Sequence, residues 1–181
     1  MRSLDWMRRG AALLLALTLV ACAAPRRAAV CPPGWSGRIA VMQGDPQQGL
    51  YGNFRLRLSD AGGSFDLLSP LGQTLAQASW NDARARVDDG HGVRDFSSFE
   101  AMAQATLGLP LPRVALQDWV RGEPSAALPS TALPGGGFEQ LGWDVSVERD
   151  GARVRLLRAS RVHGAPARVS LVFDAPCAPA R

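Results

Sequence analysis

The sequence contains no lysine, and only two histidines occur among its 181 residues. His91 and His163 have no carboxylate or second ligand around them at metal-binding spacing, so both are expected to be exposed loop residues. The motifs of serine hydrolases, zinc proteases, phosphate-binding loops and dinucleotide-binding folds are missing. Asp88 and Asp89 are neighbours on one chain and would point to opposite faces of a strand, which excludes shared acid–base work. These absences argue against an enzyme and predict neither a cofactor nor a metal site.

The net positive charge of the chain is small without its N-terminal segment. The full chain has a net charge of +4. Without Arg2, Arg8, Arg9 and Asp5, 17 basic and 15 acidic residues remain, and the net charge falls to +2. The arginines are dispersed along predicted strands and do not form a cluster, so a nucleic-acid-binding role is disfavoured.

The N-terminus has the order of features of a bacterial export signal. Three arginines precede an uncharged apolar run, Ala11 to Ala21, that is too short to cross a bilayer comfortably. The run closes with Leu19-Val20-Ala21-Cys22, which resembles the lipobox of bacterial lipoproteins. This resemblance predicts that residues 1–21 are a signal peptide and that Cys22 carries the lipid after cleavage. The next residue is Ala23. In enteric lipoproteins an aspartate at this position is the signal for retention in the inner membrane. Because Ala23 is not this signal, the resemblance predicts an outer-membrane location facing the periplasm.

The mature chain is predicted to form one domain. Residues 22–34 read as a lipidated tether with Pro25, Pro32 and Pro33, and residues 35–181 form the domain. Cleavage after Ala21 leaves 160 residues, which suffice for one hydrophobic core and are too few for two comfortable ones.

Two cysteines remain when Cys22 carries lipid. Cys31 precedes the first predicted strand and Cys177 follows the last one. In an oxidising compartment this even pair favours a disulfide, which would stabilise the fold by up to about 5 kcal/mol on the chain-entropy model. Two free thiols near the chain ends are the alternative.

Most of the domain has the two-residue hydrophobic period of strands. From 50 to 58, Gly52, Phe54 and Leu56 share one face, whereas Arg55 and Arg57 share the other. Asp150-Gly151 is a hairpin signal between two late strands. Strands are predicted over 35–42, 50–58, 64–69, 74–80, 138–149, 153–159 and 168–174, with shorter ones beside the turn at 88–90.

The middle of the chain changes to helical spacing. Ser97-Ser98-Phe99-Glu100 has capping-box spacing and opens a predicted helix over 99–107. A break at 109–112 precedes a second helix over 113–121, and 125–137 reads as a connector without periodicity. The pattern predicts a mainly antiparallel, strongly curved sheet with a helical insertion, and helices over the concave face of such a sheet make a pocket.

Two motifs resemble the LolB family of outer-membrane lipoproteins. One is Ser69-Pro70-Leu71-Gly72, and the other runs from Leu107 through Leu109-Pro110-Leu111-Pro112 to Leu116, Trp119, Gly122 and Pro124. The resemblance covers residues 35–173 and implies an open half-barrel with a helical lid over a hydrophobic cavity. It further implies a monomer that receives cargo lipoproteins from the periplasmic carrier LolA and inserts them into the outer membrane without ATP or metal.

The resemblance also implies roles for particular residues. Pro70, Leu71 and Gly72 would form the membrane-insertion loop that contacts outer-membrane lipid. A concave apolar surface would shelter the acyl chains of the cargo, although for any single member burial in a closed core is the plainer alternative. The candidates for this cavity are Phe54, Leu56, Leu116, Trp119, Val145, Val147, Leu156, Leu171 and Phe173.

The sequence departs from the family in one respect, and it leaves other roles open. The family has an amphipathic helix before the first strand, whereas here only a short tether separates Cys22 from Trp35, so part of the lid is expected to be absent. An envelope-assembly lipoprotein that acts as a scaffold without lipid transfer is the main alternative. A soluble LolA-like carrier is disfavoured by the lipobox, and an envelope hydrolase by the lack of a catalytic set.

Overall fold

The computed structural model describes residues 34–44, 49–109 and 111–175. The predicted signal peptide, the lipidation site Cys22, the tether up to Pro33, and the pair Cys31 and Cys177 lie outside the described residues. Within these ranges, no helix combines the length and the apolar composition that a membrane span requires.

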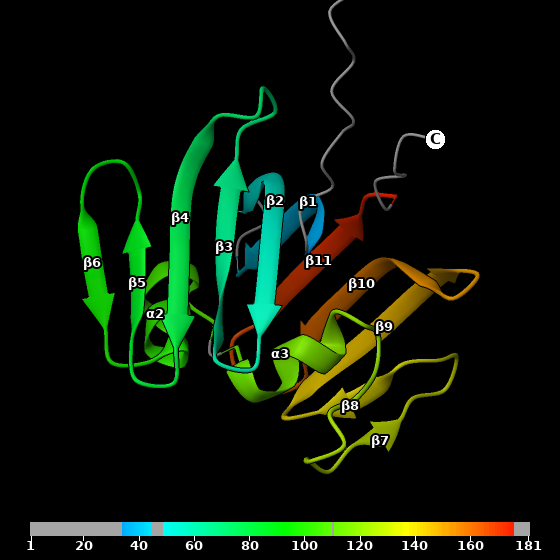
Figure 1. Ribbon diagram of the computed structural model, residues 1–181. Helices are drawn as coiled ribbons and strands as arrows, with labels where there is room; N and C mark the ends of the chain where they lie inside the picture. The colour runs from blue at the N-terminus through cyan, green and yellow to red at the C-terminus, as the bar shows by residue number, and fades with distance from the viewer. Residues whose placement is uncertain (1–33, 45–48, 110, 176–181) are drawn as a thin grey trace, which may run out of the picture. The chain divides into compact units, whose positions relative to one another are not determined.

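The strands form a single 11-stranded sheet in the order β6-β5-β4-β3-β2-β1-β11-β10-β9-β8-β7, and neighbouring strands are antiparallel (Figure 1). The first strand pairs with the last, so the two ends of the domain meet in the middle of the sheet. The strands are β1 (Trp35–Gln43), β2 (Leu50–Ser59), β3 (Gly62–Leu68), β4 (Thr74–Asn81), β5 (Ala85–Asp88), β6 (Val93–Phe96), β7 (Thr131–Ala132), β8 (Phe138–Gln140), β9 (Trp143–Asp150), β10 (Arg153–Arg161) and β11 (Ala167–Phe173).

The predicted class, a mainly antiparallel β protein with an open sheet and a helical insertion, is confirmed. The strong curvature that the sequence predicts for the sheet is not shown. The alternation predicted for β2 is present, because Phe54 and Leu56 are buried while Arg55 and Arg57 are exposed.

The two helices of the insertion are α2 (Phe99–Leu107) and α3 (Arg113–Trp119). Ser98 is the N-cap of α2, and its hydroxyl accepts a hydrogen bond from the amide of Ala101 at 3.1 Å. The predicted capping box between Ser97 and Glu100 is therefore wrong. The Glu100 carboxylate instead accepts from the amide of Arg113 at 3.1 Å, so it satisfies a donor at the start of α3 that has no intrahelical partner.

The predicted strand over 138–149 is also wrong, because the chain reverses within it. β8 and β9 form a hairpin whose two-residue turn is Leu141-Gly142, and both residues have positive φ, 55° and 77°. A turn with two left-handed residues matches the twist of a hairpin, but a leucine in that conformation is rare enough for the sequence pattern to hide it. β7 forms inside the predicted connector and pairs with β8.

The core lies on the sheet face that the helices cover. Phe99, Met102 and Ala103 are the buried residues of α2, and the Phe99 ring lies 4.7 Å from the ring of Trp80 on β4. At the other helix, Gly122 follows α3 with φ 77°, and a side chain there would lie 2.8 Å from Val147. This glycine lets the end of α3 pack closely on the late strands.

Candidate functional site

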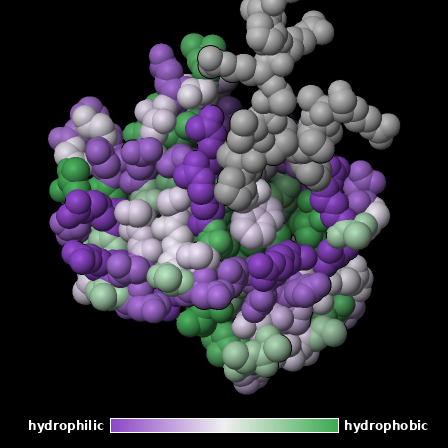
Figure 2. Space-filling view, in the orientation of Figure 1, coloured by the Kyte–Doolittle hydropathy of each residue, from purple (hydrophilic) through white to green (hydrophobic). Residues whose placement is uncertain are grey.

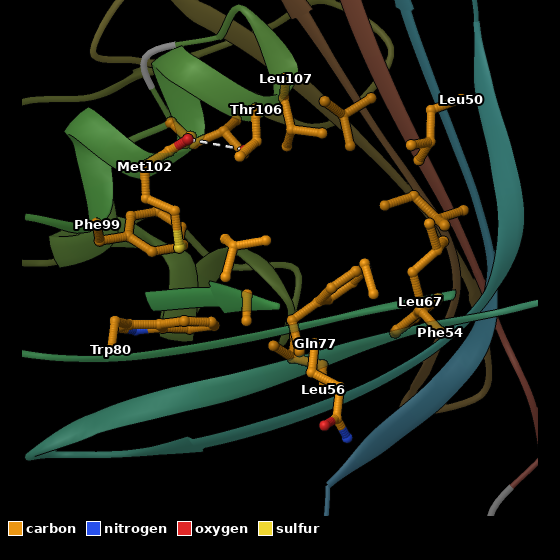
Figure 3. Close-up of a pocket in the computed structure, with 18 of the residues that line it drawn as sticks. Leu50, Phe54, Leu56, Leu67, Gln77, Trp80, Phe99, Met102, Thr106 and Leu107 are labelled. Carbon is orange, nitrogen blue, oxygen red and sulfur yellow. Dashed lines mark hydrogen bonds between the residues drawn. The ribbon is translucent and has the colours of Figure 1, made fainter. Parts of the chain in front are cut away.

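A cavity of about 290 Å³ lies between the sheet and the helical insertion. Its size is near the lower end for ligand pockets. Figure 3 shows side chains of α2 on one side of the cavity and side chains of the central strands across from them. The described lining residues are Ile39, Leu50, Phe54, Leu56, Phe65, Leu67, Ala76, Gln77, Ala78, Trp80, Val87, Asp89, Arg94, Phe99, Met102, Ala103, Thr106, Leu107, Leu111, Leu116, Val169 and Leu171.

The uncharged polar side chains of Gln77 and Thr106 present almost no free hydrogen-bonding group to the cavity interior. The Gln77 amide points away from the cavity and donates to the Asp66 carboxylate at 3.3 Å (Figure 3). The Thr106 hydroxyl donates to the backbone carbonyl of Met102 at 2.7 Å, so it is already satisfied within α2. The interior therefore suits hydrocarbon, because an apolar chain that enters leaves no buried polar group without a partner.

Two charged residues, Asp89 and Arg94, complete the lining at its solvent side. Their side chains form an ion pair at 3.2 Å and are 37% and 50% exposed, respectively. The backbone amides of His91 and Gly92 donate to the Asp89 carboxylate at 3.1 and 3.2 Å. The hydrogen bond from His91 is the largest cause that lowers the pKa of Asp89, and Arg94 lowers it further. Asp89 is thus a carboxylate at neutral pH.

The structure brings four of the predicted cavity residues together and places the other five elsewhere. Phe54 and Leu56 on β2, Leu116 on α3 and Leu171 on β11 line the cavity. Leu156 pairs with Val172 after a register shift in β10, and it lies outside the core cluster. Trp119, Val145 and Phe173 are buried in that core, and Val147 is partly buried against it. None of these four is among the described cavity-lining residues.

Trp119 helps to anchor α3 to the sheet. Its ring nitrogen donates to the Gln140 side-chain oxygen at 2.9 Å, and its ring lies 6.2 Å from that of Phe138. Gln140 is 1% exposed. It also accepts from the amide of Ser125 at 2.9 Å and donates to the carbonyls of Ser125 and Leu128 at 2.9 and 3.1 Å. One buried amide thus joins α3, the following segment and β8.

The sequence reasoning missed the part of the cavity that α2 and strands β3 to β5 provide. Alternation within the predicted strand over 64–69 would have placed Phe65 and Leu67 on one face. Met102 and Thr106 are four residues apart and share a face of the predicted helix over 99–107. Nothing in the sequence shows which strands this helix face covers.

The predicted loop between β3 and β4 holds its leucine outward. Leu71 is 89% exposed. The Ser69 amide donates to the Gln73 carbonyl at 2.8 Å, and the Gly72 amide donates to the Ser69 carbonyl at 2.9 Å. Gly72 has φ 81°, which a glycine adopts without strain. Figure 2 shows hydrophobic surface at the tip of this hairpin, where Leu75 is also exposed.

An open antiparallel sheet with an apolar cavity beneath two short helices is an arrangement that suits an apolar ligand. No group of histidine, cysteine, aspartate or glutamate in the described ranges could hold a metal ion. The family model "Outer membrane lipoprotein LolB" matches residues 34–175, and the chain belongs to this family of outer-membrane lipoproteins.

Several similar proteins carry the name outer-membrane lipoprotein LolB. The protein of Ralstonia nicotianae is 33% identical over 162 residues, which cover 77% of this chain and 78% of the relative. That of Neisseria meningitidis serogroup A is 35% identical over 124 residues, 67% of this chain and 63% of the relative. That of Bordetella petrii is 29% identical over 157 residues, 84% of this chain and 77% of the relative.

Proposed function

We propose that this protein accepts lipoproteins from the periplasmic carrier LolA and inserts them into the outer membrane. The observation that carries the proposal is the apolar cavity between the sheet and the helices, in a chain that belongs to the LolB family. The protein is a non-enzymatic receptor, and its partners are LolA and the cargo lipoproteins.

The free energy of hydrocarbon transfer explains why such a protein is needed. Exposure of one acyl chain of roughly 15 methylenes to water costs on the order of 12 kcal/mol, at about 0.8 kcal/mol per methylene. A lipoprotein with several chains therefore cannot cross the periplasm unprotected. A cavity lined by Phe54, Leu56 and Met102 shelters hydrocarbon, and subsequent transfer to the bilayer is downhill.

The finer architecture of the site is part of the proposal. The sheet acts as a half-barrel, and the helical insertion acts as its lid, which opens to admit acyl chains. Support comes from the lining, since α2 provides one wall and strands β1 to β5 and β11 provide the other. The anchoring of α3 by Trp119 and Gln140 keeps one end of the lid in place. The protein acts as a monomer.

Anchoring and membrane contact complete the proposal. Residues 1–21 are removed as a signal peptide, Cys22 is lipidated, residues 22–34 tether the domain, and residues 35–181 bind cargo. The loop Pro70-Leu71-Gly72 contacts outer-membrane lipid during insertion, and the exposure of Leu71 supports this role. Cys31 and Cys177 form a disulfide that holds the chain ends.

Filling the cavity tests the function. Ala78 lies on β4 and lines the cavity, so Ala78→Trp is expected to occupy space that an acyl chain needs. The neighbouring Ser79 is exposed and does not line the cavity, so Ser79→Trp adds the same ring outside it. The measurement is transfer of a lipoprotein from loaded LolA to the mature chain carrying Cys22→Ala, which leaves the protein unlipidated.

We expect Ala78→Trp to reduce uptake of cargo at least 10-fold and Ser79→Trp to leave it within twofold of the parent protein. Circular dichroism and thermal unfolding verify that both variants are folded. Failure of the parent protein to take cargo from LolA would contradict the function and favour the scaffold alternative. Equal uptake by both variants would show that the cavity is not the cargo site.

A further inference from the structure

The ion pair of Arg94 and Asp89 lies where the polar end of a ligand in the cavity would emerge. Arg94 and Val87 are paired across the β5–β6 ladder, so their side chains share one face. Val87 is buried and lines the cavity, which places Arg94 on the cavity face of β6. Half of the Arg94 side chain remains exposed to solvent. The guanidinium is thus at the boundary between the cavity and water.

Arg94 is held in place but keeps hydrogen-bonding capacity. One nitrogen, Nη2, donates to Asp89 Oδ2 at 3.2 Å, and the guanidinium carbon lies 5.9 Å from the centre of the Phe96 ring. Asp89 is oriented by the backbone amides of its own turn. A guanidinium has several N–H donors in a planar fork, and no other side-chain acceptor among the described residues bonds to that of Arg94.

The other side-chain donors of the described cavity wall are the Gln77 amide, the Thr106 hydroxyl and the ring nitrogen of Trp80, and the first two are already used. The Gln77 amide is bonded to Asp66 on the opposite side, and the Thr106 hydroxyl is bonded within α2. Arg94 is therefore the charged, half-exposed side-chain donor in the described lining that is available to an acceptor atom that follows a hydrocarbon chain out of the cavity. The chains of a bacterial lipoprotein are joined to their cysteine through neutral ester and amide carbonyls, which are such acceptors.

We propose that Arg94 binds the ester and amide carbonyls of the acylated cysteine of the cargo, while the acyl chains occupy the cavity. This inference rests on the proposed function and names the polar contact that positions the cargo. Asp89 has a second effect, because its carboxylate neutralises the guanidinium and repels an anionic head. The pair therefore favours a neutral acylated cysteine over the carboxylate of a free fatty acid.

The location of the pair agrees with delivery to a membrane. In Figure 1 the β5–β6 turn and the β3–β4 loop lie at the same end of their strands. The strand register agrees, since Asp88 pairs with Gln77 and Thr74 pairs with Leu68. A cysteine head held by Arg94 would thus lie at the end of the sheet that also carries Leu71.

The same hairpin provides a matched control. Arg86 pairs with Asp95 across the β5–β6 ladder, and their side chains form an ion pair at 2.7 Å. Neither residue lines the cavity, because they alternate with Val87 and Arg94 and face the other way. Arg86→Gln and Arg94→Gln thus each remove one exposed guanidinium from the same pair of strands, but only Arg94→Gln removes it from the cavity rim.

The test uses the mature chain with Cys22→Ala and three probes. They are a tripalmitoyl-glyceryl-cysteine peptide, palmitate, and diphenylhexatriene, which is apolar and has no acceptor. We expect Arg94→Gln to weaken binding of the peptide about 10-fold, which corresponds to 1.4 kcal/mol, and to leave diphenylhexatriene within twofold. Arg94→Lys is expected to restore part of the loss, and Arg86→Gln to change neither affinity. Asp89→Asn is expected to raise the affinity for palmitate relative to the peptide.

The outcomes are separable. If Arg94→Gln weakens both the peptide and diphenylhexatriene equally, Arg94 has only a structural role and the inference is wrong. If it changes neither, the carbonyls bind elsewhere and the inference is also wrong. If the parent protein binds diphenylhexatriene but not the peptide, the proposed function itself fails, independently of the Arg94 variants.

Discussion

Replacement of Leu71 by glutamate is expected to slow delivery of cargo to a bilayer without affecting its uptake from LolA. The side chain is 89% exposed and lies at the tip of a loop that is closed by its own backbone hydrogen bonds. The substitution therefore removes no packing, and the free energy of unfolding should change by less than about 0.5 kcal/mol, as for other surface positions.

The size of the effect follows from the apolar surface that Leu71 presents. Transfer of a fully exposed leucine into an apolar environment contributes about 1.5 to 3 kcal/mol. A glutamate stays in water, so the variant loses this contribution from the membrane-bound state. Since each 1.4 kcal/mol is about a factor of 10, transfer into liposomes should fall about 10- to 100-fold. Uptake from LolA should stay within twofold, because Leu71 does not line the cavity.

The assay separates the two steps and includes a matched charge control. Labelled lipoprotein is followed from LolA to the receptor, and then from the loaded receptor to liposomes. Gln73 lies in the same loop and is exposed, so Gln73→Glu adds the same charge without loss of an apolar side chain. We expect Gln73→Glu to lower transfer much less than Leu71→Glu. The reasoning is refuted if both steps survive Leu71→Glu, if both fail together, or if the two variants are equally impaired.

Three further predictions concern stability and processing. Gln140→Leu leaves the buried donors of Trp119 and Ser125 without acceptors, so it should lower the free energy of unfolding by about 2 to 6 kcal/mol. Urea titration measures this loss, and Trp119→Phe should lose less. A loss under about 1 kcal/mol for Gln140→Leu would contradict the anchoring role. Cys22→Ser should release the protein from the outer membrane or leave the precursor uncleaved, and unchanged fractionation would argue against lipidation. Non-reducing mass analysis should find Cys31 and Cys177 oxidised, and two free thiols would end that proposal.

Much of the sheet could be predicted because its signals are local. The alternation over 50–58 depends on neighbouring residues, and the structure has it. The hairpin that Asp150-Gly151 signals is also present, but its turn is Gly151-Ala152, because Asp150 is the last residue of β9 and pairs with Arg153. The prediction failed at Leu141-Gly142, since a leucine with positive φ interrupts the strand without a recognisable turn residue at that position. The sequence predicted Ser97 as the N-cap of α2, whereas the structure has Ser98 there. Both serines suit an N-cap, so the sequence pattern does not distinguish them.

The membership of the cavity could be predicted only in part. Alternation placed Phe54 and Leu56 on the apolar face of β2 and Leu171 on the apolar face of β11, and all three line the cavity. The same pattern holds for Val145 and Phe173, which are buried but do not line it. Alternation shows which face of a strand is apolar, but it does not show which part of that face is covered by another strand, by a helix or by an empty space.

The sequence by itself determined the class of the fold, the two helices, the outward loop of Leu71 and the family, because each depends on short motifs or on the period of hydrophobic residues. The tertiary structure decided where the cavity lies and what surrounds it. α2 packs beside Trp80, whereas α3 is tied to β8 through Gln140, and the cavity lies between the sheet and this insertion. These contacts join segments distant in the chain, so no local pattern specifies them. The same holds for Arg94, because its place at the cavity rim follows from its pairing with Val87.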